Sequence, residues 1–288
     1  CIGAEIAVLV HHRDGDIGQT VAIGRKGGCV AWIRNTVADA RKAYSLLQDA
    51  SPDQKLMLFH SRYAMGDRLE IEERVLNRFG KHSGSQDRAG WVLVGTQVLE
   101  QSLDFDVDLM ISDLAPIDLI IQRAGRLHRH LRQANGDLSL DGREGRSEPE
   151  LIILSPSLEG SPDASWYKTL FPTAADVYPD AGKLWLGANA LKEAGNITTP
   201  GEQGEPGAVR HLVEAVYGAD LDSVPDKLRA LSLKQIRQDM DMRSQANFNA
   251  LEIRKGYCMG SSARWYEDDR VPTRLGDETL NIYLAVWQ

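Results

Sequence analysis

Short apolar runs alternate with segments of helical periodicity through the first half of the chain. Each run has the length of a buried strand, and the segments that follow repeat apolar residues at intervals of three and four. Strands are expected within 29–35, 55–61, 90–96 and 108–114, and helices over about 37–47, 68–79 and 117–130. This alternation predicts an α/β domain with a parallel sheet between layers of helices.

The pattern changes after a polar loop and one more apolar run at 151–156. We place the end of the α/β domain near Leu158, which gives a first domain of residues 1–158 and a mostly helical accessory region of residues 159–288. Helices are expected there at about 181–194, 208–217 and 225–254. Extra strands are expected over 19–28 and, from its alternating pattern, over 279–288. The chain starts at Cys1 and not at a methionine, directly before the apolar run "IAVLV", and it ends in the strand expected over 279–288. We therefore expect a piece of a longer protein, truncated at the C-terminus.

Composition and charge mainly exclude classes of protein. The 288 residues carry 33 Lys and Arg against 41 Asp and Glu, a net charge of −8, so a phosphate ligand must be held by a local cluster. No run approaches the roughly 18 apolar residues of a membrane-spanning helix, and no signal-peptide pattern is visible. We therefore expect a cytoplasmic protein with no membrane partner. Three widely spaced cysteines, Cys1, Cys29 and Cys258, give no metal-binding pattern.

The segment "PIDLIIQRAGRLHRH" (116–130) concentrates positive charge. Arg123, Arg126, Arg129 and Arg132 fall within ten residues that contain no acid. If the segment is helical, Gln122, Arg126 and Arg129 share one stripe, at i, i+4 and i+7. Guanidinium groups make forked contacts with phosphate oxygens and stabilise a transferred phosphoryl group. The alternative is a structural ion network with the acids of "DFDVD" (104–108).

The strand expected at 90–96 ends in Gly95 and Thr96, at the edge where parallel sheets bind ligands. Backbone amides and the Thr96 hydroxyl can hold a phosphate there without reading base sequence. Asp104 follows at a spacing that could return a carboxylate to this edge, within reach of a ribose hydroxyl. The alternative for Asp104 and Asp106 is a pair of turn or cap residues.

Two strands upstream deliver polar residues to the same edge. The strand at 29–35 ends in Arg34 and Asn35, followed by Thr36, and the strand at 55–61 is followed by Arg62. Asn35 or Thr36 could equally cap the next helix, and the charges could simply be solvated. His60, in the second of these strands, is more often a structural histidine than a catalyst.

Taken in order, these segments resemble the second motor domain of superfamily 2 helicases. "VAWIRNT" looks like motif IV, "LFHSRY" through "EER" like the element after it, "VGTQVLEQSLDFD" like motif V and "QRAGRLHR" like motif VI. Within that superfamily, the residues of these motifs most resemble those of the CRISPR-associated helicase-nuclease of type I systems. The later fragments "RHLVEAVYG" and "PTRLG" resemble that family's stretch beyond the motor.

The resemblance implies a RecA-like fold and a nucleotide site shared with a first motor domain. In it, Arg126 and Arg129 are arginine fingers facing the γ-phosphate of ATP, and Gln122 and Asp104 contribute to ATP binding. Thr96, Arg34, Asn35 and Arg62 are implied to line the path of single-stranded DNA. The implied partners are this DNA, the N-terminal motor and nuclease domains of the same protein, and the CRISPR surveillance complex; ATP and Mg²⁺ serve the complete protein.

The chain itself shows no P-loop pattern, because neither Gly80-Lys81 nor Gly182-Lys183 stands in the Gly-x-x-x-x-Gly-Lys-Ser/Thr frame. It shows no Asp-Glu-x-His or Asp-Glu-x-Asp sequence and no His-Asp pair. We therefore expect that the chain alone neither binds and hydrolyses ATP nor cuts DNA, while the complete protein does both. The alternative is a non-catalytic module that binds DNA or a partner. A dinucleotide-dependent dehydrogenase is excluded by the lack of a Gly-x-Gly-x-x-Gly turn.

Overall fold

The computed structural model describes residues 4–11, 28–100, 103–199, 201–202 and 204–249. Contacts divide the chain into two compact units, residues 1–232 and residues 233–288, and the sheet belongs to the first. The strands are β1 (Ala4–His11), β2 (Val30–Ile33), β3 (Lys55–Phe59), β4 (Trp91–Gly95), β5 (Leu109–Asp113), β6 (Glu150–Leu154) and β7 (Asn196–Thr199). The helices are α2 (Val37–Ala50), α3 (Met65–Phe79), α4 (Ser85–Arg88), α5 (Ile117–Ala124), α6 (Trp166–Leu170), α7 (Ala174–Val177), α8 (Ala181–Ala194), α9 (Val209–Tyr217) and α10 (Asp226–Asn249), with short 3-10 turns η1 (Gln97–Leu99) and η2 (Leu221–Ser223).

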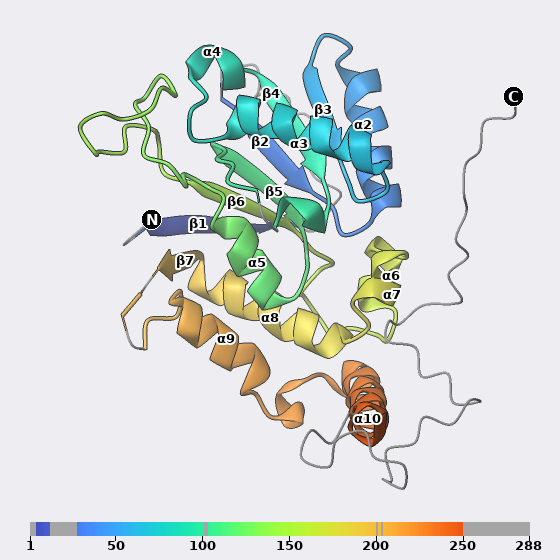
Figure 1. The fold of residues 1–288 in the computed structure, drawn as a ribbon. Coiled ribbons are helices and arrows are strands. Elements are labelled where there is room, and N and C mark those ends of the chain that lie inside the picture. The colour runs from blue at the N-terminus through green and yellow to red at the C-terminus, as the bar shows by residue number, and fades with distance from the viewer. Residues whose placement is uncertain (1–3, 12–27, 101–102, 200, 203, 250–288) are drawn as a thin grey trace, which may run out of the picture. The chain divides into compact units, whose positions relative to one another are not determined.

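Within the described residues, seven strands form one sheet in the order β3-β4-β2-β5-β6-β1-β7 (Figure 1). Neighbouring strands are parallel except β7, which runs antiparallel to β1. The predicted parallel α/β sheet is therefore confirmed. Because crossovers between parallel strands are right-handed, α2 covers one face of the sheet and α3 and α5 cover the other. Figure 1 shows α3 and α5 together on the face toward the viewer.

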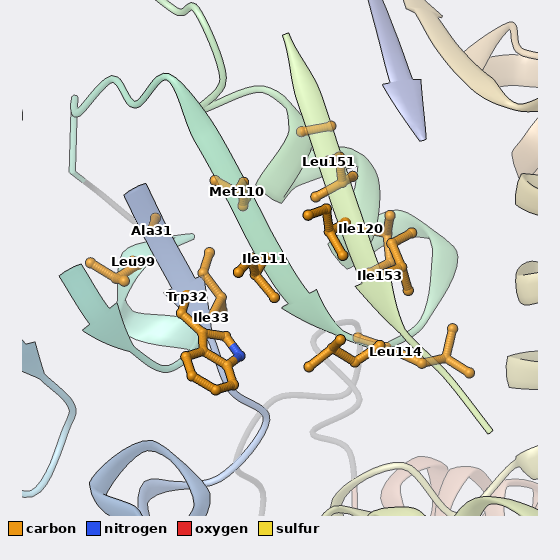
Figure 2. Packing of buried hydrophobic residues seen from close by; sticks show 14 of the residues in the cluster. Ala31, Trp32, Ile33, Leu99, Met110, Ile111, Leu114, Ile120, Leu151 and Ile153 are labelled. Atoms are coloured by element: carbon orange, nitrogen blue, oxygen red, sulfur yellow. The ribbon is translucent and has the colours of Figure 1, made fainter. Parts of the chain in front are cut away.

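The central strands are buried on both faces. Every residue of β2 and β5 is buried, and the indole of Trp32 is 1% exposed. Figure 2 shows Ile111 of β5 and Ile153 of β6 beside Ile120 of α5, all within one apolar cluster. Burying each such side chain contributes about 1.5–3 kcal/mol relative to exposing it. This core holds the carboxyl ends of the strands, and the polar residues that follow them, in fixed positions.

Local sequence signals set several helix ends. Thr36 Oγ1 accepts a hydrogen bond from Asp39 N (3.1 Å) where α2 begins, as an N-cap does. Asp180 Oδ1 accepts from Lys183 N (3.1 Å) at the start of α8, and Gly195, with a left-handed φ of 67°, follows its last residue. These signals explain why the expected helix at 181–194 coincides with α8.

The part of the chain between Leu158 and Ser232 packs against the sheet. Its strand β7 pairs with β1, and α8 contacts both β1 and α9. The compact unit that holds the sheet runs to Ser232, and the predicted domain boundary near Leu158 stays a prediction. The helices α9 and α10 lie close to the expected ranges, whereas the strands expected over 19–28 and 279–288 fall outside the described residues. In the part of the chain that the structure describes, no helix is long and apolar enough to cross a bilayer.

Candidate functional site

The helix predicted over 117–130 is shorter in the structure, because α5 ends at Ala124 with Gly125 as its C-cap. The chain then turns back onto the start of β5. Val107 N donates to Arg126 O (3.2 Å), and His128 N donates to Val107 O (3.2 Å). His128 also takes a left-handed φ of 44°, which a continuing helix does not permit. Tertiary pairing with Val107 therefore ends the helix early.

The helical stripe of Gln122, Arg126 and Arg129 is accordingly wrong as a description of the backbone. Only Gln122 lies on α5, where its side chain is exposed. Arg126 and Arg129 follow in the turns, the first half-buried and the second exposed. Arg129 nevertheless lies close enough to Arg126 that its charge helps to lower the pKa of Arg126.

Arg123 is a structural residue, fully buried below the exposed residues of the same segment. Its Nε donates to Glu100 Oε1 (2.7 Å), its Nη1 to Ser112 Oγ (2.7 Å) and its Nη2 to Asn35 Oδ1 (3.0 Å). All its bonded neighbours are buried as well. Arg123 thus joins the end of β2 to the loop after β4.

Arg132 is also buried, in a cluster near the start of β5 that we name the Asp106 network: Asp106, Asp108, Arg88, Arg132 and Arg146. Three guanidiniums meet Asp106 Oδ2, from Arg132 (2.6 Å), Arg88 (2.8 Å) and Arg146 (3.0 Å). Burial alone would raise the pKa of Asp108, but the Arg88 charge and further bonds outweigh it and lower that pKa to about 2. For Arg132, the alternative of a structural ion network is therefore the correct one.

The predicted ATP-contacting residues, Gln122, Arg126, Arg129 and Asp104, form what we name the arginine surface. Arg129 Nε bonds Asp104 Oδ1, and these two side chains are 40% and 52% exposed. His130 Nε2 lies 3.3 Å from the same oxygen. The hydrogen bond from Arg129 lowers the pKa of Asp104. An exposed pair of this kind is worth about 0–1 kcal/mol, so an anionic ligand can displace the carboxylate at small cost.

Arg126 is held by the main chain of the loop after β4. Its Nη2 donates to Glu100 O (2.7 Å), and its guanidinium lies 5.9 Å from the centre of the Phe105 ring. Its buried Nε finds no acceptor among the described residues. Burial, together with the nearby charge of Arg129, lowers the pKa of Arg126. A partly desolvated cation with an unused donor is stabilised by an added anion.

The donor set of this surface fits phosphate oxygens and not a metal ion. Two guanidiniums and an amide supply N–H donors, while Asp104 is its single carboxylate. Across the described ranges, no group of three or more His, Cys, Asp or Glu side chains is placed to hold a metal.

The predicted DNA-contacting residues gather at the carboxyl edge of the sheet. Arg34 Nε pairs with Asp113 Oδ2 (2.9 Å), and Asn35 N donates to the same oxygen (3.1 Å). Burial raises the pKa of Asp113, against the pull of Arg34. Arg34, Asn35 and Thr96 are only 6%, 1% and 2% exposed, whereas Arg62 is exposed. Their contact with a DNA strand stays a prediction, and for Arg34 and Asn35 it requires the local network to open.

Gly95 shows why the edge is built so tightly. A Cβ at this position would lie 2.7 Å from Phe59 O and 2.5 Å from Leu99 Cδ1, so only glycine fits. The close approach lets Thr96 N donate to Phe59 O (3.3 Å) and brings the ends of β3 and β4 together. The Gly-Thr pair singled out in the sequence therefore has a packing role.

The two groups of predicted residues are separate but connected. Asn35 bonds Arg123, Arg123 bonds the carboxylate of Glu100, and the carbonyl of Glu100 accepts from Arg126. An unbroken series of hydrogen bonds therefore runs from the carboxyl edge to the arginine surface. Glu100 was not among the residues predicted from the sequence, although this acid stands within the same motif as Asp104.

A parallel sheet with polar residues after β2 and β4, and arginines after α5, defines the class: a RecA-like α/β domain of the helicase type. A model of the family described as "CRISPR-associated nuclease/helicase Cas3, C-terminal" matches residues 26–132. The chain belongs to this family of CRISPR-associated helicase-nucleases and corresponds to the C-terminal part of its members.

Individual relatives are similar in sequence to most of this chain. The CRISPR-associated endonuclease/helicase Cas3 of Escherichia coli (strain K12) is 43% identical over 206 residues, 71% of this chain and 21% of that protein. The Thermus thermophilus protein of the same description is 32% identical over 281 residues, 90% of this chain and 28% of that protein. The crystal structure of T. fusca Cas3 superposes with a TM-score of 0.68 at 30% identity, covering 86% of this chain and 27% of that one. The chain thus spans about a quarter of its relatives' length.

Proposed function

We propose that this chain is the second motor half, with an accessory region, of an ATP-dependent single-strand DNA translocase that degrades target DNA together with a nuclease domain in type I CRISPR interference. The observation that carries the proposal is the arginine surface. Arg126 and Arg129 stand beside a displaceable carboxylate, while Arg123 and Arg132 in the same segment are consumed by internal bonds.

In the proposal, Arg126 and Arg129 face the γ-phosphate of ATP, and Gln122 and Asp104 complete the nucleotide contacts. Asp104 gives up Arg129 when the phosphate arrives and turns to the ribose. Related T. fusca Cas3 structures described as complexes with AMPPNP, ATP and ADP, at TM-scores of 0.67, 0.66 and 0.65, support nucleotide use by the complete protein. The P-loop and the Mg²⁺ ligands come from the first motor domain.

The carboxyl edge supplies the DNA path in this proposal, through Thr96, Arg34, Asn35 and Arg62. Contacts to phosphates and not to base edges let such a motor move on any sequence. The hydrogen bonds that link Asn35 to Arg126 through Arg123 and Glu100 support communication between the DNA and ATP sites. A similar structure described as a CRISPR RNA-guided surveillance complex in a pre-nicking state supports that assembly as a partner (TM-score 0.65).

The test replaces single arginines in the complete helicase-nuclease and measures DNA-stimulated ATP hydrolysis. Arg126→Ala or Arg129→Ala should lower the turnover rate by about 10³–10⁵, the loss expected for an arginine finger. The matched control is Arg143→Ala, which removes an exposed guanidinium from a loop outside the site. Turnover that is unchanged in both Arg126→Ala and Arg129→Ala would leave these residues structural and favour the non-catalytic module.

A second measurement addresses the chain by itself. Mixed with ATP, Mg²⁺ and single-stranded DNA, the 288-residue chain should release no phosphate above background, because it carries only one wall of the nucleotide site. Robust DNA-stimulated release by this chain would refute the shared-site proposal directly.

A further inference from the structure

A cavity of about 710 Å³ opens along β3, the edge strand of the sheet, far from the residues of the arginine surface in sequence. Its floor is aliphatic and includes Leu56 and Leu58 of the strand and Ile71 of α3. Tyr44 of α2 also lines it. Because α2 and α3 cover opposite faces of the sheet, the cavity is a groove with one wall on each side of the strand.

The backbone of β3 directs hydrogen-bonding groups toward this groove. Phe59 O accepts from Thr96 N, so Phe59 faces β4. Backbone groups alternate in direction along a strand, so Leu56 and Leu58 direct their N–H and C=O groups outward. Tyr63 Oη donates to Leu58 O (3.4 Å), which confirms that direction. Among the described residues, no strand pairs with β3 on this side.

The charge of the groove is set by α3. Ile71, Arg74 and Arg78 lie at i, i+3 and i+7 and all line the cavity, whereas the acids Glu70 and Glu73 of α3 do not. Arg74 is exposed. One acid, Asp87, lies at the rim, and its carbonyl accepts from Arg78 Nη1 (3.4 Å). Two guanidiniums against one carboxylate give the groove a positive balance.

Two of the three aromatic side chains that line the groove are already engaged. The Arg78 guanidinium lies over the Trp91 ring, 4.8 Å from its centre, and the Tyr63 ring stacks on His60 at 4.3 Å with an interplanar angle of 10°. Flat faces that a nucleic-acid base would need are therefore partly covered. An aliphatic floor, outward backbone groups and arginines together suit a polypeptide strand better than an oligonucleotide.

We propose that this groove binds an extended peptide segment of a partner protein, with alternating apolar and acidic side chains, which adds as a strand to β3. Its carboxylates, all on the side of the added strand that faces α3, would pair with Arg74 and Arg78. Its apolar side chains would lie on the opposite side, toward Tyr44 of α2. The outward N–H groups of Leu56 and Leu58 and the outward carbonyl of Leu56 supply the main-chain hydrogen bonds, as in other cases of strand addition. The proposal is independent of the motor function.

The test titrates the 288-residue chain into a fluorescein-labelled decapeptide of alternating Val and Glu and follows fluorescence anisotropy at low ionic strength. Arg74→Glu should weaken binding at least about threefold, because an attractive charge becomes repulsive. The matched control is Arg68→Glu, which reverses a charge on the same helix outside the cavity and should leave the affinity unchanged. With the peptide bound, amide hydrogen exchange at Leu56 and Leu58 should slow.

Two further probes separate the alternatives. The same decapeptide N-methylated at alternate residues should not bind, since it lacks the donors for strand pairing, and a labelled dT10 oligonucleotide should not compete. The proposal is overturned if the Val-Glu peptide does not bind. It is also overturned if the N-methylated peptide or a Val-Lys peptide binds as tightly as the Val-Glu peptide. It is overturned as well if dT10 displaces the Val-Glu peptide and binds more weakly to the Arg74→Glu variant than to the parent chain.

Discussion

One stretch of ten residues supplies Arg132 to the Asp106 network and Arg126 and Arg129 to the arginine surface, and the two regions use these arginines in opposite ways. Arg132 is fully buried and shares one carboxylate oxygen of Asp106 with two other guanidiniums, while Arg129, three residues earlier, pairs with a carboxylate that is 52% exposed. Residue type and spacing are the same in both cases. The difference teaches that the surrounding acceptors, and not the motif itself, decide which arginine is structural and which remains available for a ligand.

The acceptors explain the contrast in detail. Besides Asp106, Arg132 donates to Ser83 O (2.7 Å), Gly80 O (2.9 Å) and Gly136 O (3.0 Å), so its guanidinium is saturated. A buried charge must be satisfied in this way, because an uncompensated one is strongly destabilising. Arg129 faces water instead, and its pair with Asp104 can open. Substitutions at the two carboxylates should therefore differ sharply in effect.

The largest effect on stability is expected for Asp106→Ala. It leaves three guanidiniums without their shared acceptor, two of them almost completely buried, and breaking such a buried pair costs about 3–5 kcal/mol. The free energy of unfolding from urea titration measures the loss. Asp104→Ala is the matched control and should cost less than about 1 kcal/mol. Equal losses in the two variants would contradict the division between the regions.

A smaller effect should appear as a pH dependence of the Asp106 network. The pKa of Asp108, about 2 in the folded chain, lies below the ordinary value of 3.8. Its ionised form therefore stabilises the fold above the ordinary pKa, and this contribution of about 2 kcal/mol is lost as the pH falls from about 4 to 2. The difference in unfolding free energy between the parent chain and Asp108→Asn should shrink over that range. A difference that stays constant with pH would show that Asp108 is not held in its charged form.

The smallest effect is expected within the arginine surface. A double-mutant cycle on Arg129→Ala and Asp104→Ala should give a coupling free energy of about 0.2–1 kcal/mol at low salt, as for other exposed pairs. Added salt should reduce it further through screening. A coupling of 3 kcal/mol or more, on the scale of buried pairs, would mean that the carboxylate is not readily displaced, which would count against a site prepared for an anion.

Much of the fold could be predicted because the signals are local. The strands β2, β3, β4 and β5 are apolar runs, and α8 is delimited by Asp180 and Gly195. The strand β7, "NITT", is too short and polar to be recognised without its partner β1. The early end of α5 could not be predicted either, because the pairing of Arg126 and His128 with Val107 depends on the folded sheet.

The site was predictable only as a set of residue types near one another. The sequence indicates arginines suited to phosphate, but not that Arg123 and Arg132 are consumed internally, because the acceptors Glu100 and Asp106 are brought to them by tertiary structure. Arg88 and Arg146 of the Asp106 network are far from it in sequence and carry no motif. Burial of Arg34 and Asn35 was likewise invisible, since polar residues after a strand are usually taken to be exposed.

Glu100 accepts hydrogen bonds from two arginines with different groups: its carboxylate accepts from Arg123 and its peptide carbonyl accepts from Arg126. A codon change at this position deletes the first acceptor but never the second, since all twenty amino acids keep the same carbonyl. A substitution of Glu100 can therefore remove its side-chain hydrogen bond with Arg123, which leads on to Asn35, while the hydrogen bond from Arg126 remains. The position of Arg126 thus depends on a main-chain acceptor, which a change of the side chain at position 100 does not remove.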